Sequence, residues 1–102
     1  MPAEDVLKWL AAWYQLQCDG DWEHQHGVEV GTLDNPGWRL RVNLAGTELE
    51  GRYMERRVLD RSSDDWMQCW LEDDCFHAAG GPTNLGELLR AFQAWATSPD
   101  EV

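Results

Sequence analysis

One run of alternating residues constrains the fold of this chain more than any other feature. Between residues 38 and 44, apolar side chains occupy every second position and polar side chains lie between most of them. A period of two is typical of a strand with one buried face. The segment Asp-Asn-Pro-Gly at residues 34–37 directly precedes this run and favours a tight turn. Residues 28–32 alternate before the turn, so the two runs predict an antiparallel hairpin.

Two further strands are predicted, over residues 49–59 and 66–71. The first alternates less regularly, which favours a bulge or an exposed face. Residues 75–76 follow an acidic turn and are expected to continue the edge of the sheet. The small residues at 78–82 predict a loose linker to the last helix. Because short turns join the strands, we expect an antiparallel meander.

Both ends of the chain are predicted to be helical. Residues 4–17 lack Gly and interior Pro, and they begin with acids that suit the positive end of the helix dipole. Their broad apolar arc indicates a well-covered helix. Near the C-terminus, Asn84 and Glu87 have the spacing of a capping box, and an apolar stripe follows over residues 85–96. Pro99 is expected to end this helix.

The sequence therefore predicts an α+β fold, with a four-stranded antiparallel meander sheet flanked by an N-terminal and a C-terminal helix. A chain of 102 residues has room for one core, so residues 1–102 are expected to form a single domain. No stretch approaches the roughly 20 apolar residues of a membrane span, and no signal peptide is evident. We therefore expect a cytoplasmic protein whose odd number of cysteines, Cys18, Cys69 and Cys75, stays reduced.

Charge narrows the choice of partner. Eight Lys and Arg against nineteen Asp and Glu give a formal net charge of −11. Nucleic acids and anionic membranes require clustered cations, so neither is expected to bind. A basic protein surface is the favoured partner. Because alternate loops of a meander share one end of the sheet, the acids at residues 19–23 and 72–74 are expected at one end, with Asp34 and residues 64–65 at the other.

Residues 18–26 place a thiol, three acids and two imidazoles within nine positions. Zinc could be bound by Cys18, His24 and His26, with Cys75 and His77 completing the site, but the spacing matches no common zinc pattern. Cys18 and His24 could alternatively form a nucleophilic pair in a small enzyme, although the surrounding acids disfavour a thiolate. We expect no bound metal, no cofactor and no enzymatic activity.

Seven Trp residues exceed what one core of this size requires, so some are expected at the surface. A Trp among surface carboxylates is typical of a protein-binding hot spot. Trp66 and Trp70 share one face of their strand. This face is covered if each helix packs on its own face of the sheet, and otherwise it is exposed. The predicted partner-binding residues are Asp19, Asp21, Trp22, Glu23 and His24, with Asp34 and Trp66 as further choices.

Two runs also carry a resemblance to a known family. The specific parts are Cys-Asp-Gly-Asp-Trp-Glu-His at residues 18–24 and Leu-Asp-Asn-Pro-Gly-Trp at residues 33–38, and weaker matches extend over nearly the whole chain. Together they resemble the Immunity protein 53 family. The resemblance implies a bacterial protein of a polymorphic toxin system, which is made beside a toxin and neutralises it in the producing cell. It assigns no role to individual residues.

The resemblance and the charge lead to one expected function. A stoichiometric inhibitor of a cognate toxin domain would act by steric and electrostatic occlusion, without chemistry of its own. If the toxin is a nuclease, a negative surface would suit its cationic active site and would accelerate association. The identity of the toxin and the oligomeric state of the chain do not follow from the sequence.

Overall fold

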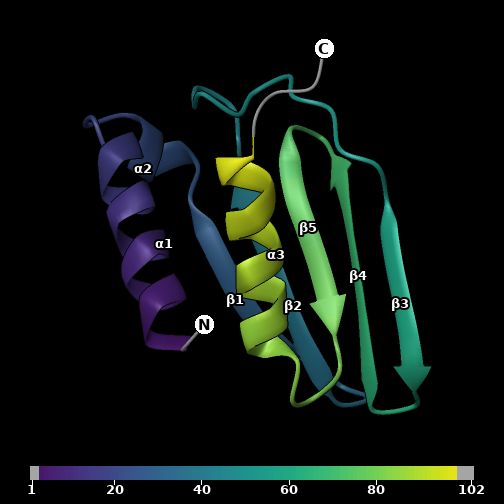
Figure 1. Ribbon diagram of the computed structural model, residues 1–102. Helices are drawn as coiled ribbons and strands as arrows, with labels where there is room; N and C mark the ends of the chain where they lie inside the picture. The colour runs from purple at the N-terminus through teal and green to yellow at the C-terminus, as the bar shows by residue number, and fades with distance from the viewer. Residues whose placement is uncertain (1–2, 99–102) are drawn as a thin grey trace.

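The computed structural model describes residues 3–98 of the chain. Within that range the chain forms five strands and three helices, which confirms an α+β fold but exceeds the expected four strands by one (Figure 1). In chain order the elements are α1 (Ala3–Gln17), α2 (Trp22–Gln25), β1 (Val28–Leu33), β2 (Gly37–Asn43), β3 (Arg57–Ser62), β4 (Asp65–Glu72), β5 (Cys75–Gly80) and α3 (Leu85–Thr97).

The five strands form one antiparallel sheet with the order β1-β2-β5-β4-β3. The predicted hairpin is confirmed, since β1 and β2 pair in the register that places Thr32 opposite Trp38. The predicted meander is wrong, because β2 pairs with β5 and not with the strand that follows it. A hairpin and a three-stranded unit therefore join along β2 and β5, and residues 44–56 connect them across one end of the sheet.

The strand predicted over residues 49–59 is largely replaced by this connection. Leu49 is buried, and its backbone N–H donates to the hydroxyl oxygen of Thr47, which itself donates to the carbonyl of Leu44. The apolar residue that suggested a strand is thus the anchor of a loop. β3 begins only at Arg57, and its register shift lies between Asp60 and Ser62, beyond the strand predicted over residues 49–59 in which a bulge was expected.

The segment expected to be a sheet edge and a loose linker is instead the central strand β5. Its small residues permit close packing. A Cβ atom on Gly80 would lie 3.0 Å from a methyl carbon of Leu88 in α3, and one on Gly81 would lie 2.4 Å from the carbonyl oxygen of Asp64. Ala78 is almost fully buried beneath the helices. Larger side chains would push α3 off the sheet.

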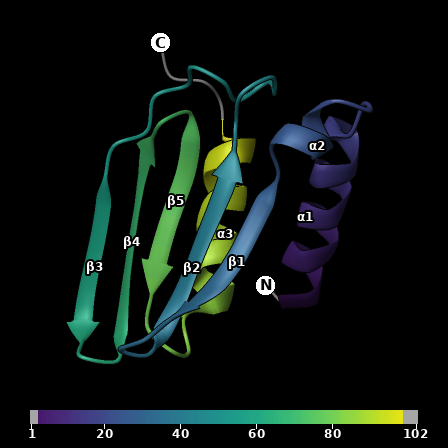
Figure 2. The ribbon, with the colours of Figure 1, turned by 180° about the vertical axis from the view of Figure 1, so that it is seen from behind.

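Both α1 and α3 lie on the same side of the sheet (Figures 1 and 2). The side chain of Phe92 in α3 meets Trp13 of α1 at 5.2 Å and Phe76 of β5 at 5.1 Å between ring centroids. These contacts join the two helices to the sheet in one core. Within residues 3–98 no helix covers the opposite face, where Trp66 and Trp70 are half-buried.

The helices depart from expectation in two details. α1 is not well covered, since Leu7 is 53% and Leu16 is 82% exposed. The capping box of α3 is not formed, because the side chain of Asn84 bonds no N–H of the helix. Asn84 instead donates to the carboxylates of Asp65 and Glu87 and accepts from the backbone N–H of Trp66, which ties the start of α3 to β4. Pro99, expected to end α3, lies outside the described residues.

Candidate partner-binding surface

The acidic loop between α1 and α2 is organised by its own carboxylates. The Oδ1 atom of Asp19 accepts the backbone N–H groups of Asp21 at 2.9 Å and Trp22 at 3.0 Å. The carboxylate of Glu23 accepts those of Asp19 at 3.0 Å and Gly20 at 2.9 Å. The pKa of Asp19 is held below its usual range by the two hydrogen bonds that its carboxylate accepts, first from the N–H of Trp22 and then from that of Asp21. The carboxylates of Asp19 and Glu23 therefore preorganise the backbone of this loop.

Trp22 is buried, although the sequence predicted it to lie at the surface. It is 5% exposed, and its ring packs against Trp13 and Tyr14 of α1. Its indole N–H donates to the carbonyl oxygen of Ala45 at 3.0 Å. Trp22 consequently anchors the acidic loop to the β2–β3 connection, while its neighbours Asp21 and His24 remain exposed.

A second acidic segment meets the same connection. The carbonyl oxygen of Asp74, in the β4–β5 turn, accepts the backbone N–H of Leu44 at 2.8 Å. Because Leu44 and Ala45 are adjacent, the two acidic segments lie at one end of the sheet, as expected (Figure 1). We call this surface the acidic end and define it by Asp19, Asp21, Glu23, Glu72, Asp73 and Asp74.

The β4–β5 turn keeps two carboxylates in an unfavourable backbone conformation. Asp73 has φ 55° and Asp74 has φ 58°, so both lie in the left-handed region. A two-residue hairpin turn with both φ values positive strongly favours Asn-Gly. Aspartate is tolerated in this conformation, but its negative charge does not contribute to forming the turn.

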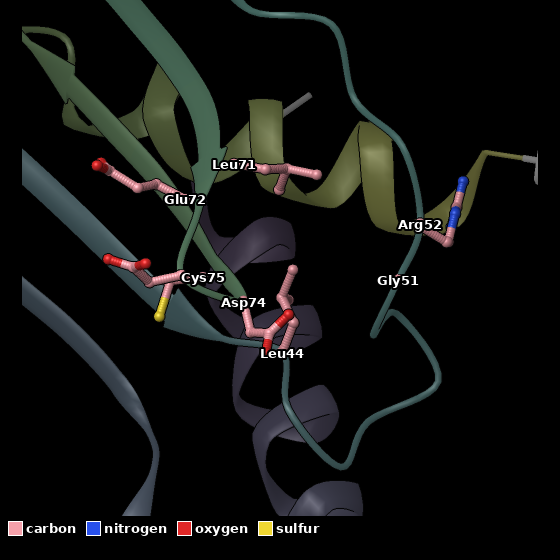
Figure 3. A pocket seen from close by; sticks show the side chains of 8 residues that line it. Leu44, Gly51, Arg52, Leu71, Glu72, Asp74 and Cys75 are labelled. Carbon is pink, nitrogen blue, oxygen red and sulfur yellow. The ribbon is translucent and has the colours of Figure 1, made fainter.

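A hollow of about 210 Å³ opens beside this turn (Figure 3). Leu44, Leu71 and Cys75 form its apolar part. Its charged lining consists of three carboxylates and one guanidinium, those of Glu72, Asp73, Asp74 and Arg52. A neighbouring hollow, also of about 210 Å³, is lined by Asp21 and Trp22. The acidic end is thus a surface with two shallow depressions, each bordered by carboxylates, which suits protruding cationic side chains.

The remaining two predicted residues are not brought together with the acidic end. Asp34 lies in the exposed β1–β2 turn and Trp66 near the start of β4, at the opposite end of the sheet (Figure 2). Two acids at that opposite end are paired with one arginine. Arg61 contacts Asp65 at 2.9 Å and Glu87 at 2.6 Å, and the hydrogen bond from Arg61 lowers the pKa of Asp65. This end of the sheet therefore presents less uncompensated charge.

Two thiols of the suggested metal and nucleophile sites donate hydrogen bonds to other groups. The thiol of Cys18 donates to the carbonyl oxygen of Tyr14 at 3.3 Å. The thiol of Cys75 donates to Asn43, and burial raises its pKa. Among residues 3–98, no three His, Cys, Asp or Glu side chains are grouped so that they could hold a metal ion. The suggested cluster of Cys18, His24, His26, Cys75 and His77 is accordingly not formed.

Sequence reasoning missed a stack of side chains on the uncovered face of the sheet. The ring of Trp70 lies parallel to that of His77 at 5.3 Å, and the guanidinium of Arg56 lies 4.8 Å from the centre of Trp70. Arg41, opposite His77 in the sheet, pairs with Glu29 at 2.9 Å. The alternation of β4 placed Trp70 on this face, but no sequence signal joined it to Arg56 or His77.

Comparison with known proteins identifies the chain at the level of a family. A family model described as Immunity protein 53 matches residues 7–97. The chain belongs to the Immunity protein 53 family. Comparison with curated proteins and with solved structures gave no match. The resemblance drawn from the two specific sequence runs is therefore confirmed.

The match to Immunity protein 53 runs from α1 to α3 and includes every residue of the acidic end. Membership of a family of immunity proteins indicates a role in neutralising a toxin and implies a toxin protein as the binding partner. Within residues 3–98, no helix has both the length and the apolar character needed to cross a membrane.

Proposed function

We propose that this protein is a stoichiometric inhibitor that binds a cognate toxin domain of a bacterial polymorphic toxin system in the cytoplasm of the producing cell. The acidic end covers a positively charged active site, such as that of a nuclease, and excludes its substrate. The protein performs no chemistry. Family membership supports the toxin-neutralising role, and the net charge of −11 supports a basic partner.

The observation that carries this proposal is the meeting of two acidic segments on one short stretch of chain. The bond from Trp22 to Ala45 fixes the α1–α2 loop, and the bond from Leu44 to Asp74 fixes the β4–β5 turn. A rigid array of carboxylates can replace the phosphates of a substrate at several subsites simultaneously. Its field also steers a basic partner toward the surface before contact.

Residues of the acidic end have different roles in this proposal. The carboxylates of Asp19 and Glu23 accept hydrogen bonds from the loop backbone, so they stabilise the conformation of the loop as well as contribute charge. Asp21 makes no side-chain cap bond to α2 and is free to contact the toxin, together with the exposed His24. Asp34 and Trp66 are assigned to a separate, secondary contact because they lie at the other end of the sheet.

Charge substitution tests this surface. Asp21→Lys and Asp74→Asn change charge at the acidic end without removing a loop-forming bond, whereas Asp60→Lys makes the same change as Asp21→Lys on the exposed strand β3. Stopped-flow association with the purified toxin domain is measured at low and high salt. We expect about a tenfold slower association for Asp21→Lys at low salt, a smaller difference at high salt, and little change for Asp60→Lys.

Equal association rates for Asp21→Lys and the unmodified protein would remove the acidic end from the mechanism. If Asp34→Lys alone slowed association, the primary contact would move to the opposite end of the sheet. A role for Cys18 chemistry is tested separately, because Cys18→Ser should retain full protection of cells against the toxin. Loss of protection by a folded Cys18→Ser protein that still binds the toxin would contradict inhibition by occlusion.

A further inference from the structure

An apolar groove separates α1 from the outer edge of the sheet. Its volume is about 410 Å³, and it is lined mainly by Leu7, Leu10 and Tyr14 of α1 and by Gly27 and Val28 at the start of β1. Leu7 is 53% and Tyr14 39% exposed, and Val30, further along β1, is 48% exposed. Figures 1 and 2 both show α1 standing beyond β1, so the groove lies at the start of an edge strand.

The backbone of β1 is oriented to accept another strand from this side. The carbonyl oxygen of Gly27 accepts the backbone N–H of Asn43 at 2.9 Å, which makes Gly27 and Asn43 a hydrogen-bonded pair. In an antiparallel ladder such pairs alternate with pairs that turn their N–H and C=O groups outward. By the register of β1 and β2, the outward-facing residues are Val28, Val30 and Thr32.

The two edges of the sheet differ in how they are protected against further pairing. β3, at the far edge, carries a register shift between Asp60 and Ser62 and includes Arg57 and Arg61. Bulges and positively charged residues are devices that prevent strand addition. β1 pairs with β2 in unbroken register over all six of its residues and contains no Lys, Arg or Pro. The edge beside the groove is the one left open.

We propose that this groove receives an extended segment of the toxin, which pairs with β1 as a sixth strand and places apolar side chains against Leu7 and Tyr14. The inference rests on the proposed function and adds a second contact to the acidic end. Strand addition gains affinity from main-chain hydrogen bonds and specificity from the pockets that receive alternate side chains.

Charge around the groove identifies the chemistry of the segment. His26 lines both the groove and the adjoining hollow that contains Asp19 and Asp21, so one end of the groove opens onto the acidic end. An occupant that follows the groove would place its last residues among carboxylates. The segment is therefore apolar along its length and ends in Lys or Arg. A second copy of this chain has a net charge of −11, so the carboxylates at this end of the groove would repel it.

The test compares matched substitutions in complexes with the purified toxin domain. Leu7→Ser changes the groove, and Leu16→Ser makes the same change at a position of α1 that is 82% exposed and does not line it. Val30→Ser on the β1 edge is matched by Val58→Ser on β3, where Val58 is 54% exposed. Val30→Pro removes only an outward-facing N–H, which edge strands tolerate. Amide hydrogen exchange of the unmodified protein is measured with and without toxin.

We expect Leu7→Ser, Val30→Ser and Val30→Pro to weaken the complex about tenfold or more, while Leu16→Ser and Val58→Ser leave its affinity unchanged. Toxin binding should also slow exchange at the amides of Val28, Val30 and Thr32. The exchange measurement and Leu7→Ser keep the test decisive even if Val30→Pro does not fold.

Three results would overturn the inference, and they are distinguishable. If the complex forms and depends on Asp21 but neither the exchange rates nor the affinities of the groove variants change, the groove is not a toxin contact. If the chain alone is a dimer that Val30→Pro dissociates, the edge binds a second copy. If the unmodified protein forms no complex with the toxin domain, the proposed function fails and this inference fails with it.

Discussion

The indole nitrogen of Trp22 lies 3.0 Å from the carbonyl oxygen of Ala45, a residue 23 positions later in the chain. This single bond joins the α1–α2 loop to the connection between the two parts of the sheet. It satisfies both groups at a place where the Trp22 ring is 5% exposed. A side chain chosen from the sequence as a surface anchor is therefore the internal support of the surface that we assign to toxin binding.

Removing the indole N–H should destabilise the protein modestly. Trp22→Phe keeps an aromatic ring against Trp13 but leaves the carbonyl of Ala45 without this donor, so we expect the free energy of unfolding to fall by about 1–3 kcal/mol. Trp38→Phe is the control, since Trp38 donates to Pro82 at an exposed position and should cost less. Urea denaturation measures both. Equal losses for the two variants would show that burial of the Trp22 bond has no special weight.

Acid should weaken the α1–α2 loop through Asp19. Its folded-state pKa is lowered, mainly by the hydrogen bonds from the N–H groups of Trp22 and Asp21. Stability from this group is therefore present above its unfolded pKa of about 3.9 and is lost as the pH falls through the lower folded value. Asp19→Asn keeps an acceptor oxygen but cannot ionise, so its unfolding free energy should fall less than that of the unmodified protein between neutral pH and the acid range. An identical fall in both proteins would contradict this assignment.

The β4–β5 turn should show a conflict between stability and binding. Asp73→Asn with Asp74→Gly supplies residues that favour positive φ. The free energy of unfolding of the double variant should therefore be about 1 kcal/mol higher than that of the unmodified protein. It also removes two carboxylates from the acidic end, so its association with the toxin should be slower. Thermal unfolding and stopped-flow association are measured on the same preparation. A variant that is more stable and binds as fast would show that these charges have no part in recognition.

Close backbone packing should make Gly37 intolerant of a side chain. A Cβ atom there would lie 2.4 Å from the carbonyl oxygen of Gly80, a backbone atom that cannot turn away. We expect Gly37→Ala to lower the free energy of unfolding by about 1–3 kcal/mol. Gly31→Ala is the matched control in the neighbouring strand, because its Cβ would meet only the flexible guanidinium of Arg39 at 3.1 Å. Chemical denaturation should therefore find Gly31→Ala the less damaging of the two.

Local sequence signals predicted the elements that are locally determined. The turn at residues 34–37 and the alternation on either side of it predicted the β1–β2 hairpin, and the apolar stripe predicted α3. Leu49 misled the prediction because a buried loop anchor and an inward-facing strand residue look alike in sequence. Residues 75–76 were expected at the edge of the sheet, but the rest of β5 was missed because Ala and Gly are poor strand formers. Gly80 is explained by the close approach of Leu88 in α3 and of the backbone of Trp66.

The candidate surface was predictable to a similar extent. The gathering of acidic loops at one end follows from alternation of chain direction, and the structure has it (Figure 1). The burial of Trp22 could not be inferred, since it depends on the position of Trp13 and Ala45. The groove beside β1 was also beyond reach, because the sequence does not reveal that α1 stands beyond that edge of the sheet.

Strand order has a consequence for when this protein becomes functional during its synthesis. The central partner of β2 is β5, whose residues Cys75–Gly80 leave the ribosome after most of the chain. Until then the first hairpin has no neighbour along β2, and the turn that contributes Asp73 and Asp74 has no completed strand on its far side. Isolated two-stranded hairpins are at best marginally stable. A chain truncated before β5 would therefore lack the partner of β2, and its two acidic segments would not be held together as they are in the folded protein.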